Sequence, residues 1–362
     1  MFNGIYKDKK VLITGHTGFK GSWLTTWLLK LGAKVVGISK DIPTSPSIFK
    51  ELDLKSKITD YREDIRDLNK IVEIISKERP DFIFHLAAQP IVSLSYSNPI
   101  ETISSNILGT ANILEALRVL DLPITAIMIT SDKAYDNVEQ VWGYKEDDKM
   151  GGKDIYSGSK GSAELVIKSY YHSFFKSNPN IKLAIGRAGN VIGGGDWAKD
   201  RIVVDCMEAW SMGELVEIRS PNATRPWQHV LEPLSGYLTL GQALYKDNSL
   251  DGEAFNFGPR AEQNHTVKEL LIDLSKYWHF NSVEKAFKVT DNIPFHEAGL
   301  LKLNCDKALF YLKWHSTLEY KDTIKFTSEW YYDFYKENIN IYNKTLSQIG
   351  EYEELAKNNT TY

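Results

Sequence analysis

The sequence predicts an α/β fold built on a doubly wound parallel sheet, with a smaller carboxyl-terminal lobe. Three observations support this prediction. Strand-like and helix-like segments alternate through the first half, the strand-like segments are nearly continuous runs of Val, Ile and Leu, and a glycine-rich turn follows the first of them. Apolar runs of this kind suit strands that helices bury on both faces. Regular alternation of the two element types favours a doubly wound sheet.

The expected elements follow one another along the chain. Strands are expected at residues 9–15, 34–39, 81–88, 124–131 and 181–187, and helices at 19–31, 67–78, 98–120 and 155–176. After about residue 188 the composition shifts to clustered Gly, Pro, Trp and Arg, and one more apolar strand at 253–258 is expected to rejoin the sheet. We therefore expect a Rossmann-like domain over 1–187 with 253–258, a smaller lobe over 188–252 and 259–335, and a polar tail over 336–362.

The composition argues against several classes of protein. Of 362 residues, 43% are hydrophobic, which is too much apolar surface for a disordered chain. The chain has 43 Lys and Arg against 47 Asp and Glu, and this mildly acidic balance argues against nucleic-acid partners. No apolar stretch is typical of a signal peptide or long enough to span a membrane, so no membrane partner is expected. Two distant cysteines, Cys206 and Cys305, and scattered histidines predict no metal site and a cytoplasmic location.

A glycine-rich turn joins the first expected strand to the first helix. Its sequence is Gly15-His16-Thr17-Gly18-Phe19-Lys20-Gly21. Glycines at this spacing let the backbone approach a pyrophosphate, which the free N–H groups of the helix amino terminus then hold. The position predicts a dinucleotide site formed by Gly15, Thr17, Gly18, Phe19 and Gly21, and a purely structural turn is the alternative.

The residues themselves leave the type of dinucleotide open. An acidic side chain at the end of the second strand would favour NAD, but the chain has Ser39 there, and the neighbouring Lys40 suits a 2′-phosphate. Asp64, with Ile65 beside it, is a candidate for the adenine end. The alternative for Asp64 is a charge at the amino terminus of a helix.

Tyr156 and Lys160 lie four residues apart and therefore on one face of an expected helix. A cation beside a phenol favours the phenolate, so we expect Lys160 to lower the pKa of Tyr156. Such a tyrosine can take a proton from a hydroxyl while hydride leaves the same carbon. A solvated helix face is the alternative.

Three polar residues, Ser131, Asp132 and Lys133, lie where another expected strand ends. Ligands of doubly wound sheets bind at the carboxyl ends of the strands. A hydroxyl there can share the proton path to Tyr156, and an acid with a base can remove the elements of water. The alternative is a solvated ion pair on a loop.

These motifs together resemble the extended short-chain dehydrogenase/reductase family, and within it the nucleotide-sugar 4,6-dehydratases. The similarity spans most of the chain, through TGHTGFKGSW (14–23), PTSPSIF (43–49), HLAAQPIVSLSYSNP (85–99), TSDKAYDN (130–137), YSGSK (156–160), GRAGNVIGGGDW (186–197), TRPWQHVLEPLSGYL (224–238) and PFHEAGLLKLNCDKA (294–308). Within that family, HTGFKGSW and SDKAYDN resemble the branch that acts on CDP-sugars.

The resemblance implies NAD as the cofactor and a CDP-sugar as the substrate. Tyr156 would take the proton of the 4-hydroxyl with the help of Ser131 and Lys160, and Asp132 would protonate the departing 6-hydroxyl. Many relatives have Thr-Asp-Glu where this chain has Ser-Asp-Lys, so Lys133 or a water molecule would be the base at C5. Hydride would return to C6 and give a 4-keto-6-deoxy sugar for deoxysugar synthesis.

The resemblance also implies contacts to both ligands and an oligomer. Leu86, Ala87 and Ala88 would pass under the nicotinamide ribose. The nucleotide sugar would be held by Asn190, Arg201, Arg225 and His296, while Trp227 is expected in the core. Ordinary surface positions are the alternative for the two arginines. Relatives pair two long helices per subunit, so a homodimer or a dimer of dimers is expected.

Rival functions remain at this stage. A nucleotide-sugar 4-epimerase would need Tyr156 and Lys160 but not Asp132, and a dehydratase of another nucleotide-linked hexose would use the same scaffold. A cofactor-sensing regulatory protein would keep the glycine turn and lose the catalytic tyrosine. The intact set Ser131, Tyr156 and Lys160 speaks against that class.

Overall fold

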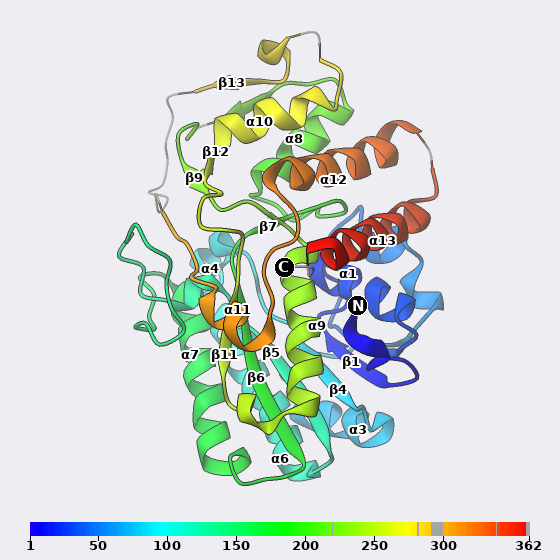
Figure 1. The fold of residues 1–362 in the computed structure, drawn as a ribbon, viewed down its shortest axis with the longest axis vertical. Coiled ribbons are helices and arrows are strands. Elements are labelled where there is room, and N and C mark those ends of the chain that lie inside the picture. Colours follow the sequence, from blue (N-terminus) through cyan, green and yellow to red (C-terminus); the bar gives the residue numbers. More distant parts are fainter. Residues whose placement is uncertain (219, 281, 291–299, 338, 360–362) are drawn as a thin grey trace.

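The computed structural model describes residues 1–218, 220–280, 282–290, 300–337 and 339–359. A parallel sheet with helices on both faces forms one part, and a second lobe lies at one end of the sheet (Figure 1). The segments of this lobe come mainly from the second half of the chain, as the colours of the ribbon show.

The described residues form a seven-stranded sheet in the order β11-β6-β5-β4-β1-β2-β3, and all neighbouring strands are parallel. Its strands are β1 (Lys10–Thr14), β2 (Lys34–Ile38), β3 (Thr59–Tyr61), β4 (Phe82–His85), β5 (Ile124–Ile129), β6 (Ile181–Ala188) and β11 (Ala254–Phe257). The strand order reverses between β1 and β4, which is where open α/β sheets bind ligands. The predicted doubly wound fold is confirmed.

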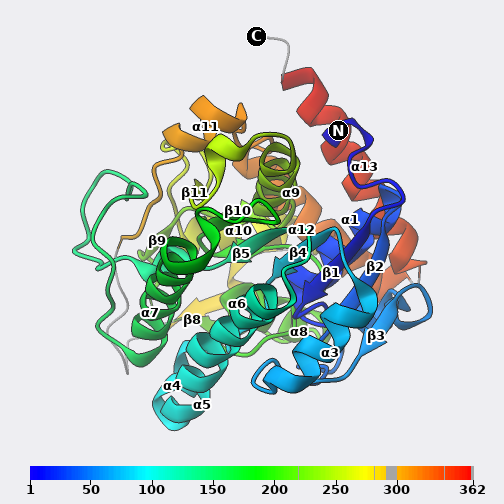
Figure 2. The same cartoon turned by 90° about the horizontal axis from the view of Figure 1, so that it is seen from below.

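Each face of the sheet has its own helices and its own apolar core. Against one face lie α3 (Leu68–Glu78), α6 (Gly109–Leu120) and α7 (Ile155–Tyr170), and against the other lie α1 (Phe19–Lys30) and α9 (Leu231–Lys246) (Figure 2). Two separate clusters of buried residues match these two faces. The strands are buried on both sides, which explains why their sequences are apolar throughout.

The remaining helices and strands are short or belong to the second lobe. The helices are α2 (Ile48–Glu51), α4 (Val92–Ser97), α5 (Pro99–Ile103), α8 (Ile202–Ser211), α10 (Val267–Lys276), α11 (Asp306–Leu312), α12 (Tyr320–Tyr332) and α13 (Ile341–Asn359). The strand pairs are β7 (Val191–Ile192) with β10 (Gln228–His229), β9 (Thr224–Arg225) with β12 (His265–Thr266), and β8 (Val216–Ile218) with β13 (Phe287–Val289).

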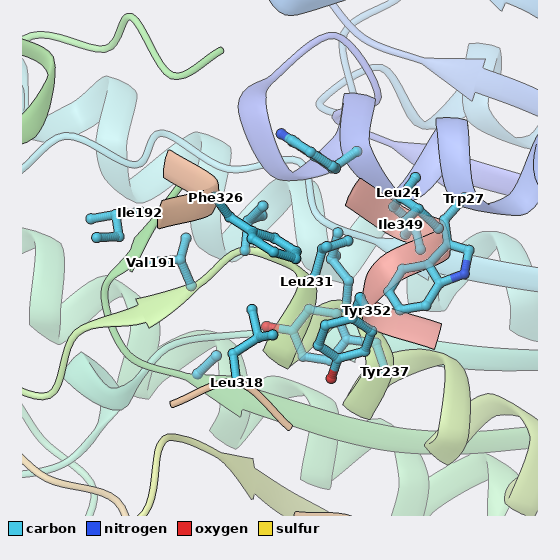
Figure 3. Packing of buried hydrophobic residues seen from close by; sticks show 14 of the residues in the cluster. Leu24, Trp27, Val191, Ile192, Leu231, Tyr237, Leu318, Phe326, Ile349 and Tyr352 are labelled. Atoms are coloured by element: carbon cyan, nitrogen blue, oxygen red, sulfur yellow. The ribbon is translucent and has the colours of Figure 1, made fainter. Parts of the chain in front are cut away.

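The structure corrects two local expectations. The single helix expected over 98–120 is α5, a π-helical turn η3 (Ser104–Leu108) and α6. The carboxyl-terminal segment expected to be a polar tail is instead folded, since α13 packs against α1. Ile349 and Tyr352 of α13 are fully buried (Figure 3). Three or four residues separate its apolar positions, so a largely polar sequence still buries one face of the helix.

Glu232 is a buried carboxylate that ties α9 to two later segments. It accepts hydrogen bonds from the backbone N–H groups of Thr317 at 2.9 Å and Leu318 at 2.5 Å, and from the Tyr352 hydroxyl at 3.0 Å. Burial raises the pKa of Glu232 from 4.5 to about 7, although the two N–H donors act in the opposite direction. The carboxyl group is therefore easier to protonate in the folded protein than in the unfolded chain.

We expect Glu232 to make the folded protein less stable as pH rises from 5 to 8. The folded-state pKa lies above the unfolded value, so this contribution is complete below pH 4.5 and is lost as pH rises through about 7. The shift corresponds to about 3 kcal/mol in the free energy of unfolding. Urea unfolding of the wild type and of Glu232→Gln at pH 5 and pH 8 gives the free energy of unfolding of each protein. The loss of stability between the two pH values in the wild type, minus the loss in the variant, is the contribution of Glu232. Glu262→Gln, at an exposed position, is the control, and equal pH dependence in all three proteins would contradict the prediction.

Candidate active site

The glycine-rich turn forms a narrow cradle between β1, α1 and β4. Gly15 has a φ of +77°, which favours glycine, and a Cβ there would lie 2.8 Å from the backbone nitrogen of Ala87. A Cβ on Gly21 would lie 2.1 Å from the carbonyl oxygen of Gly15. Gly18 caps α1 without a side-chain hydrogen bond, so the N–H groups of the first turn remain available to a ligand. The cradle fits a pyrophosphate.

The loop after β4, where the nicotinamide ribose is expected, lies beside this cradle. The hydroxyl of Thr14 lies 2.7 Å from Nδ1 of His85 and accepts the N–H of Ala87 at 3.1 Å, which fixes the loop after β4. Leu86, Ala87 and Ala88 are all partly accessible there. Their role under a nicotinamide ribose stays a prediction.

The end of β2 has no carboxylate of its own, but one lies nearby. Ser39 Oγ is 2.9 Å from His16 Nδ1, and His16 Nε2 is 2.8 Å from Oδ1 of Asp60, a residue of β3. The ammonium of Lys40 is 3.3 Å from Glu101, so a cation proposed for a 2′-phosphate already has an acidic partner. Asp60 is also paired with Arg62 at 2.9 Å, so both carboxylates at this end of the site have cationic partners.

Asp64 and Ile65 lie between β3 and α3. The Asp64 carboxylate binds the guanidinium of Arg66 at 2.6 Å, and this arginine lowers the pKa of Asp64. The side chain that caps α3 is Asp67 rather than Asp64. Ile65 is buried at 7% exposure. The role of both residues at the adenine end stays a prediction.

Tyr156 and Lys160 lie on the first two turns of α7. Asp154 starts this helix by accepting the N–H of Ser157 at 2.9 Å. Asn106 of η3 donates to Ser159 at 2.9 Å, which holds the helix against η3. Lys160 Nζ lies 6.0 Å from the centre of the Tyr156 ring. Both side chains are buried, with exposed fractions of 7% for the tyrosine and 8% for the lysine. The four-residue spacing does place them on one face.

Ser131 and Asp132 follow β5 and lie next to Tyr156. The Ser131 hydroxyl donates to Asp132 at 2.9 Å and accepts the backbone N–H of Lys133 at 3.2 Å. Asp132 is 5% exposed, and a Cβ on Gly189 would lie 3.1 Å from its Oδ2. The side chain of Lys133 is partly exposed. The edge of the sheet therefore brings together residues from the ends of β5 and β6 and from α7.

The expected lowering of the Tyr156 pKa is wrong for this state of the protein. Burial raises the pKa of Tyr156 to about 12, and the negative charge of Asp132 acts in the same direction. Arg201 and the Ser131 hydroxyl oppose this increase without overcoming it. Burial also lowers the pKa of Lys160 to about 8, so the low dielectric disfavours the charged forms of both groups.

The residues expected to hold the nucleotide sugar occupy several places. Arg201 precedes α8 and forms an ion pair with the buried Asp196, and its charge acts on Tyr156. Asn190 is exposed after β6. Arg225 lies on β9, where its guanidinium donates to the carbonyl of Thr224 at 2.8 Å. Trp227 is 6% exposed and belongs to the core, as expected. His296 lies outside the described residues.

Two parts of the site were not anticipated from the sequence. The first is Lys20 in the glycine-rich turn, whose pKa burial lowers to about 8, with Arg201, Asp132 and Lys160 among the charges that act on it. The second is the fully buried ion pair of Arg187 on β6 with Glu164 on α7 at 2.6 Å. A lysine in the first turn of a helix is unfavourable beside the positive end of the dipole, and this signal was present in the sequence.

The described residues contain no group of three or more His, Cys, Asp or Glu side chains arranged to hold a metal ion. In the same part of the chain, no helix is both long enough and apolar enough to cross a membrane.

Comparison with known proteins assigns the chain to a family. Residues 12–327 match the family described as GDP-mannose 4,6 dehydratase. The chain belongs to this family. The CDP-glucose 4,6-dehydratase of Salmonella typhimurium is 45% identical over 334 residues, which cover 90% of this chain and 91% of the relative. The CDP-paratose 2-epimerase of Salmonella typhi is 26% identical and covers 89% of this chain and 98% of its own.

Solved structures show how widely the fold of this GDP-mannose 4,6 dehydratase family member is shared. A UDP-glucose 4-epimerase of Thermotoga maritima superposes with a TM-score of 0.76 at 24% identity, covering 90% of this chain and 99% of the other. A dTDP-glucose 4,6-dehydratase of Streptomyces venezuelae, solved with NAD and TYD, has a TM-score of 0.76 at 18% identity and covers 91% and 97%. Likeness at these identities shows the fold alone.

Proposed function

We propose that this chain is a CDP-glucose 4,6-dehydratase, a hydro-lyase that uses NAD to convert CDP-D-glucose into CDP-4-keto-6-deoxy-D-glucose. The observation that carries the proposal is the 45% identity to the Salmonella typhimurium enzyme of that name over 90% of the chain. The cradle at Gly15 and Gly21 and the adjacent Ser131, Asp132, Tyr156 and Lys160 supply the groups that this reaction needs. NAD rather than NADP fits a site where Lys40 already faces Glu101.

The side chains divide the reaction between proton transfer and orientation. Tyr156 takes the proton of the 4-hydroxyl, and Ser131, whose hydroxyl lowers the pKa of the phenol, shares the path. When bound, NAD would supply the hydride acceptor for C4 and the hydride donor for C6, and its positive charge would favour the phenolate. Asp132 protonates the departing 6-hydroxyl as water leaves. Arg201, Arg225 and Asn190 bind the nucleotide sugar, and the arginines suit its diphosphate.

A panel of CDP-, dTDP-, GDP- and UDP-glucose tests the proposed function. Each is incubated with the enzyme loaded with NAD, and the products are identified by mass spectrometry. We expect the loss of one water molecule from CDP-glucose, at a higher rate than from the other three. A product of unchanged mass with inverted configuration at C4 would instead assign a 4-epimerase. Preferred loss of water from one of the other nucleotide sugars would show that the substrate has a different nucleotide base.

We also propose that the protein is a cytoplasmic homodimer, or a dimer of such dimers, that supplies deoxysugars for surface polysaccharide such as lipopolysaccharide. The cytoplasmic location is supported by two unpaired cysteines. The dimer is supported by exposed apolar side chains on α4 to α6 and on α7 and the turn after it, elements that pack together (Figure 2). These side chains are Leu94, Tyr96, Ile100, Ile103, Leu108, Leu165 and Phe174.

We expect Ile100→Asp to break this dimer. Ile100 is 74% exposed, and a buried aspartate at an apolar interface has no partner to offset its desolvation. Light scattering after size-exclusion chromatography measures the mass. Val289→Asp is the control, because Val289 is 49% exposed on β13 in the other lobe. An unchanged mass of the Ile100 variant, or a wild type that is monomeric, would contradict the prediction.

A further inference from the structure

His85 is the last residue of β4, and each of its two ring nitrogens lies next to a buried threonine. Nδ1 is 2.7 Å from the hydroxyl of Thr14 at the end of β1, and Nε2 is 3.1 Å from the hydroxyl of Thr110 in α6. The residue is 3% exposed. Because protein hydroxyls occupy both nitrogens, the ring connects β1, β4 and α6 instead of contacting a ligand.

The hydrogen bonds around His85 fit one arrangement of protons. The Thr110 hydroxyl donates its single hydrogen to the backbone carbonyl of Asn106 at 2.7 Å, so it accepts from Nε2–H of the ring. Burial lowers the pKa of His85 to about 3, so the ring is neutral and its Nδ1 accepts the hydrogen of the Thr14 hydroxyl. Thr14 in turn accepts the backbone N–H of Ala87 at 3.1 Å. The ring is therefore the Nε2–H tautomer.

Asn106 continues this chain of hydrogen bonds to the helix that carries Tyr156. Its Oδ1 accepts the backbone N–H of Gln89 at 2.7 Å, and its Nδ2 donates to the carbonyl of Gln89 at 3.2 Å and to the Ser159 hydroxyl at 2.9 Å. The Ser159 hydroxyl donates to the backbone carbonyl of Tyr156 at 2.7 Å. One amide thus holds the loop after β4 and the first turn of α7 together.

The chain connects two parts of the candidate active site. At one end Ala87 lies against the glycine cradle, and at the other end is the helix turn with the phenol of Tyr156. Replacing the ring of His85 by an apolar group would leave the Thr14 donor and the Thr110 acceptor unpaired away from water, which is costly. The side chains that form the chain are all at most 5% exposed, namely Thr14, His85, Asn106, Thr110 and Ser159.

We propose that His85 is a positioning residue for the C4 oxidation of the reaction proposed above, on which this inference rests. Its Nε2–H tautomer fixes the loop expected to carry the nicotinamide ribose relative to the helix that carries Tyr156. In this step the hydride of C4 leaves to the nicotinamide and the proton of the 4-hydroxyl leaves to the Tyr156 phenolate, so the alcohol becomes a ketone. Both acceptors have to reach groups on one carbon together, and a misplacement of about 1 Å costs up to about 100-fold in rate.

The test compares His85→Leu and His85→Gln in enzyme loaded with NAD. Bound NAD per subunit, the KM for CDP-glucose and the rate of NADH formation in a single turnover are measured. We expect His85→Leu to keep its NAD and its KM within a few-fold while it forms NADH about 10- to 100-fold more slowly. His85→Gln should recover most of the rate, because its amide offers one acceptor and one donor in place of the two ring nitrogens.

Ser159→Ala interrupts the same chain at its other end, by a change that favours the helix. It should also slow NADH formation while NAD stays bound. The double variant His85→Leu with Ser159→Ala should be little slower than His85→Leu, whereas independent effects would multiply. The control is Tyr6→Phe, which should keep the wild-type rate. It removes a buried hydrogen bond, from the Tyr6 hydroxyl to the carbonyl of Leu238 at 2.6 Å, before β1 begins.

Nitrogen NMR of histidine-labelled enzyme reads the tautomer directly. The His85 signals, assigned by their loss in His85→Gln, should show a protonated Nε2 and an unprotonated Nδ1 from pH 5 to pH 9. A charged ring or the Nδ1–H tautomer would overturn the proposal. So would wild-type NADH formation by His85→Leu or Ser159→Ala, a glutamine variant as slow as the leucine variant, or multiplied effects in the double variant.

Two further outcomes separate this proposal from its alternatives. Loss of NAD from His85→Leu, with normal NADH formation by the loaded fraction, would show a role in cofactor binding alone and would contradict positioning for C4 oxidation. Failure of the proposed function has a different signature, since the wild type itself would then form no dehydrated product from CDP-glucose.

Discussion

Replacing Tyr156 by phenylalanine is expected to lower kcat by about 10³-fold, within the range that general acid–base catalysis contributes. In the proposed mechanism the phenol hydroxyl takes the proton of the substrate, and phenylalanine keeps the ring but removes this oxygen. The ring is 7% exposed and packs at the start of α7, so the fold should survive. Steady-state turnover of CDP-glucose and the formation of NADH in a single turnover measure the effect, and both should fall together.

The control for this variant lies on the same helix. Tyr170→Phe removes a hydroxyl that lies 3.3 Å from Glu115, at the other end of α7, and should turn over at the wild-type rate. A spectroscopic measurement adds an independent check. Because burial raises the pKa of Tyr156 to about 12, the enzyme without NAD should show no phenolate absorbance from this residue at pH 8. Near-normal turnover of Tyr156→Phe would remove this tyrosine as the base.

Replacing Arg187 by methionine is expected to lower the free energy of unfolding by about 3–5 kcal/mol, because it leaves a buried carboxylate without a cationic partner. The guanidinium binds Glu164 at 2.6 Å, and both side chains are fully buried. The Nη1 atom of the same guanidinium donates to the Tyr135 hydroxyl at 2.6 Å and to the carbonyl of Glu146 at 2.8 Å. Glu164 also accepts the hydroxyl of Thr130 at the end of β5, so the network supports the catalytic edge.

A second variant distinguishes the lost ion pair from lost packing. Adding Glu164→Gln to Arg187→Met removes the unpaired charge while keeping an acceptor for Thr130, so stability should partly recover. Urea unfolding followed by fluorescence measures both proteins. If the double variant is no more stable than Arg187→Met, the loss comes from packing and the ion-pair explanation is wrong.

Much of the fold could be predicted because its signals are local. Long apolar runs identify β1, β2, β4, β5 and β6, and helical periodicity identifies the helices between them. β3 was missed, since its three residues Thr59–Tyr61 are polar or partly exposed and have no apolar run. The sequence predicts a polar tail where the structure has α13, because the few apolar residues of this helix are buried only by distant segments, among them α1 and α12. Average polarity therefore hid an amphipathic pattern.

The site, too, has parts that local motifs predict and parts that depend on contacts between distant segments. The cradle at Gly15 and the couple of Tyr156 and Lys160 follow from short motifs, because their spacing alone fixes which residues share a turn or a helix face. The pKa of Tyr156 does not follow from spacing. The sequence pairs it with a cation, whereas in the fold its burial and the charge of Asp132 dominate and raise it.

The amino-acid sequence by itself determined most strands of the sheet, the glycine-rich turn and the family, since each of these signals lies in residues that are neighbours along the chain. Only the tertiary structure decided which charges meet. It brings Lys20 from the first helix and Arg201 from the second lobe to Asp132, and it buries Arg187 against Glu164. The physical reason is that burial and Coulomb energy depend on distances through space, and these distances are set by packing between segments far apart in sequence.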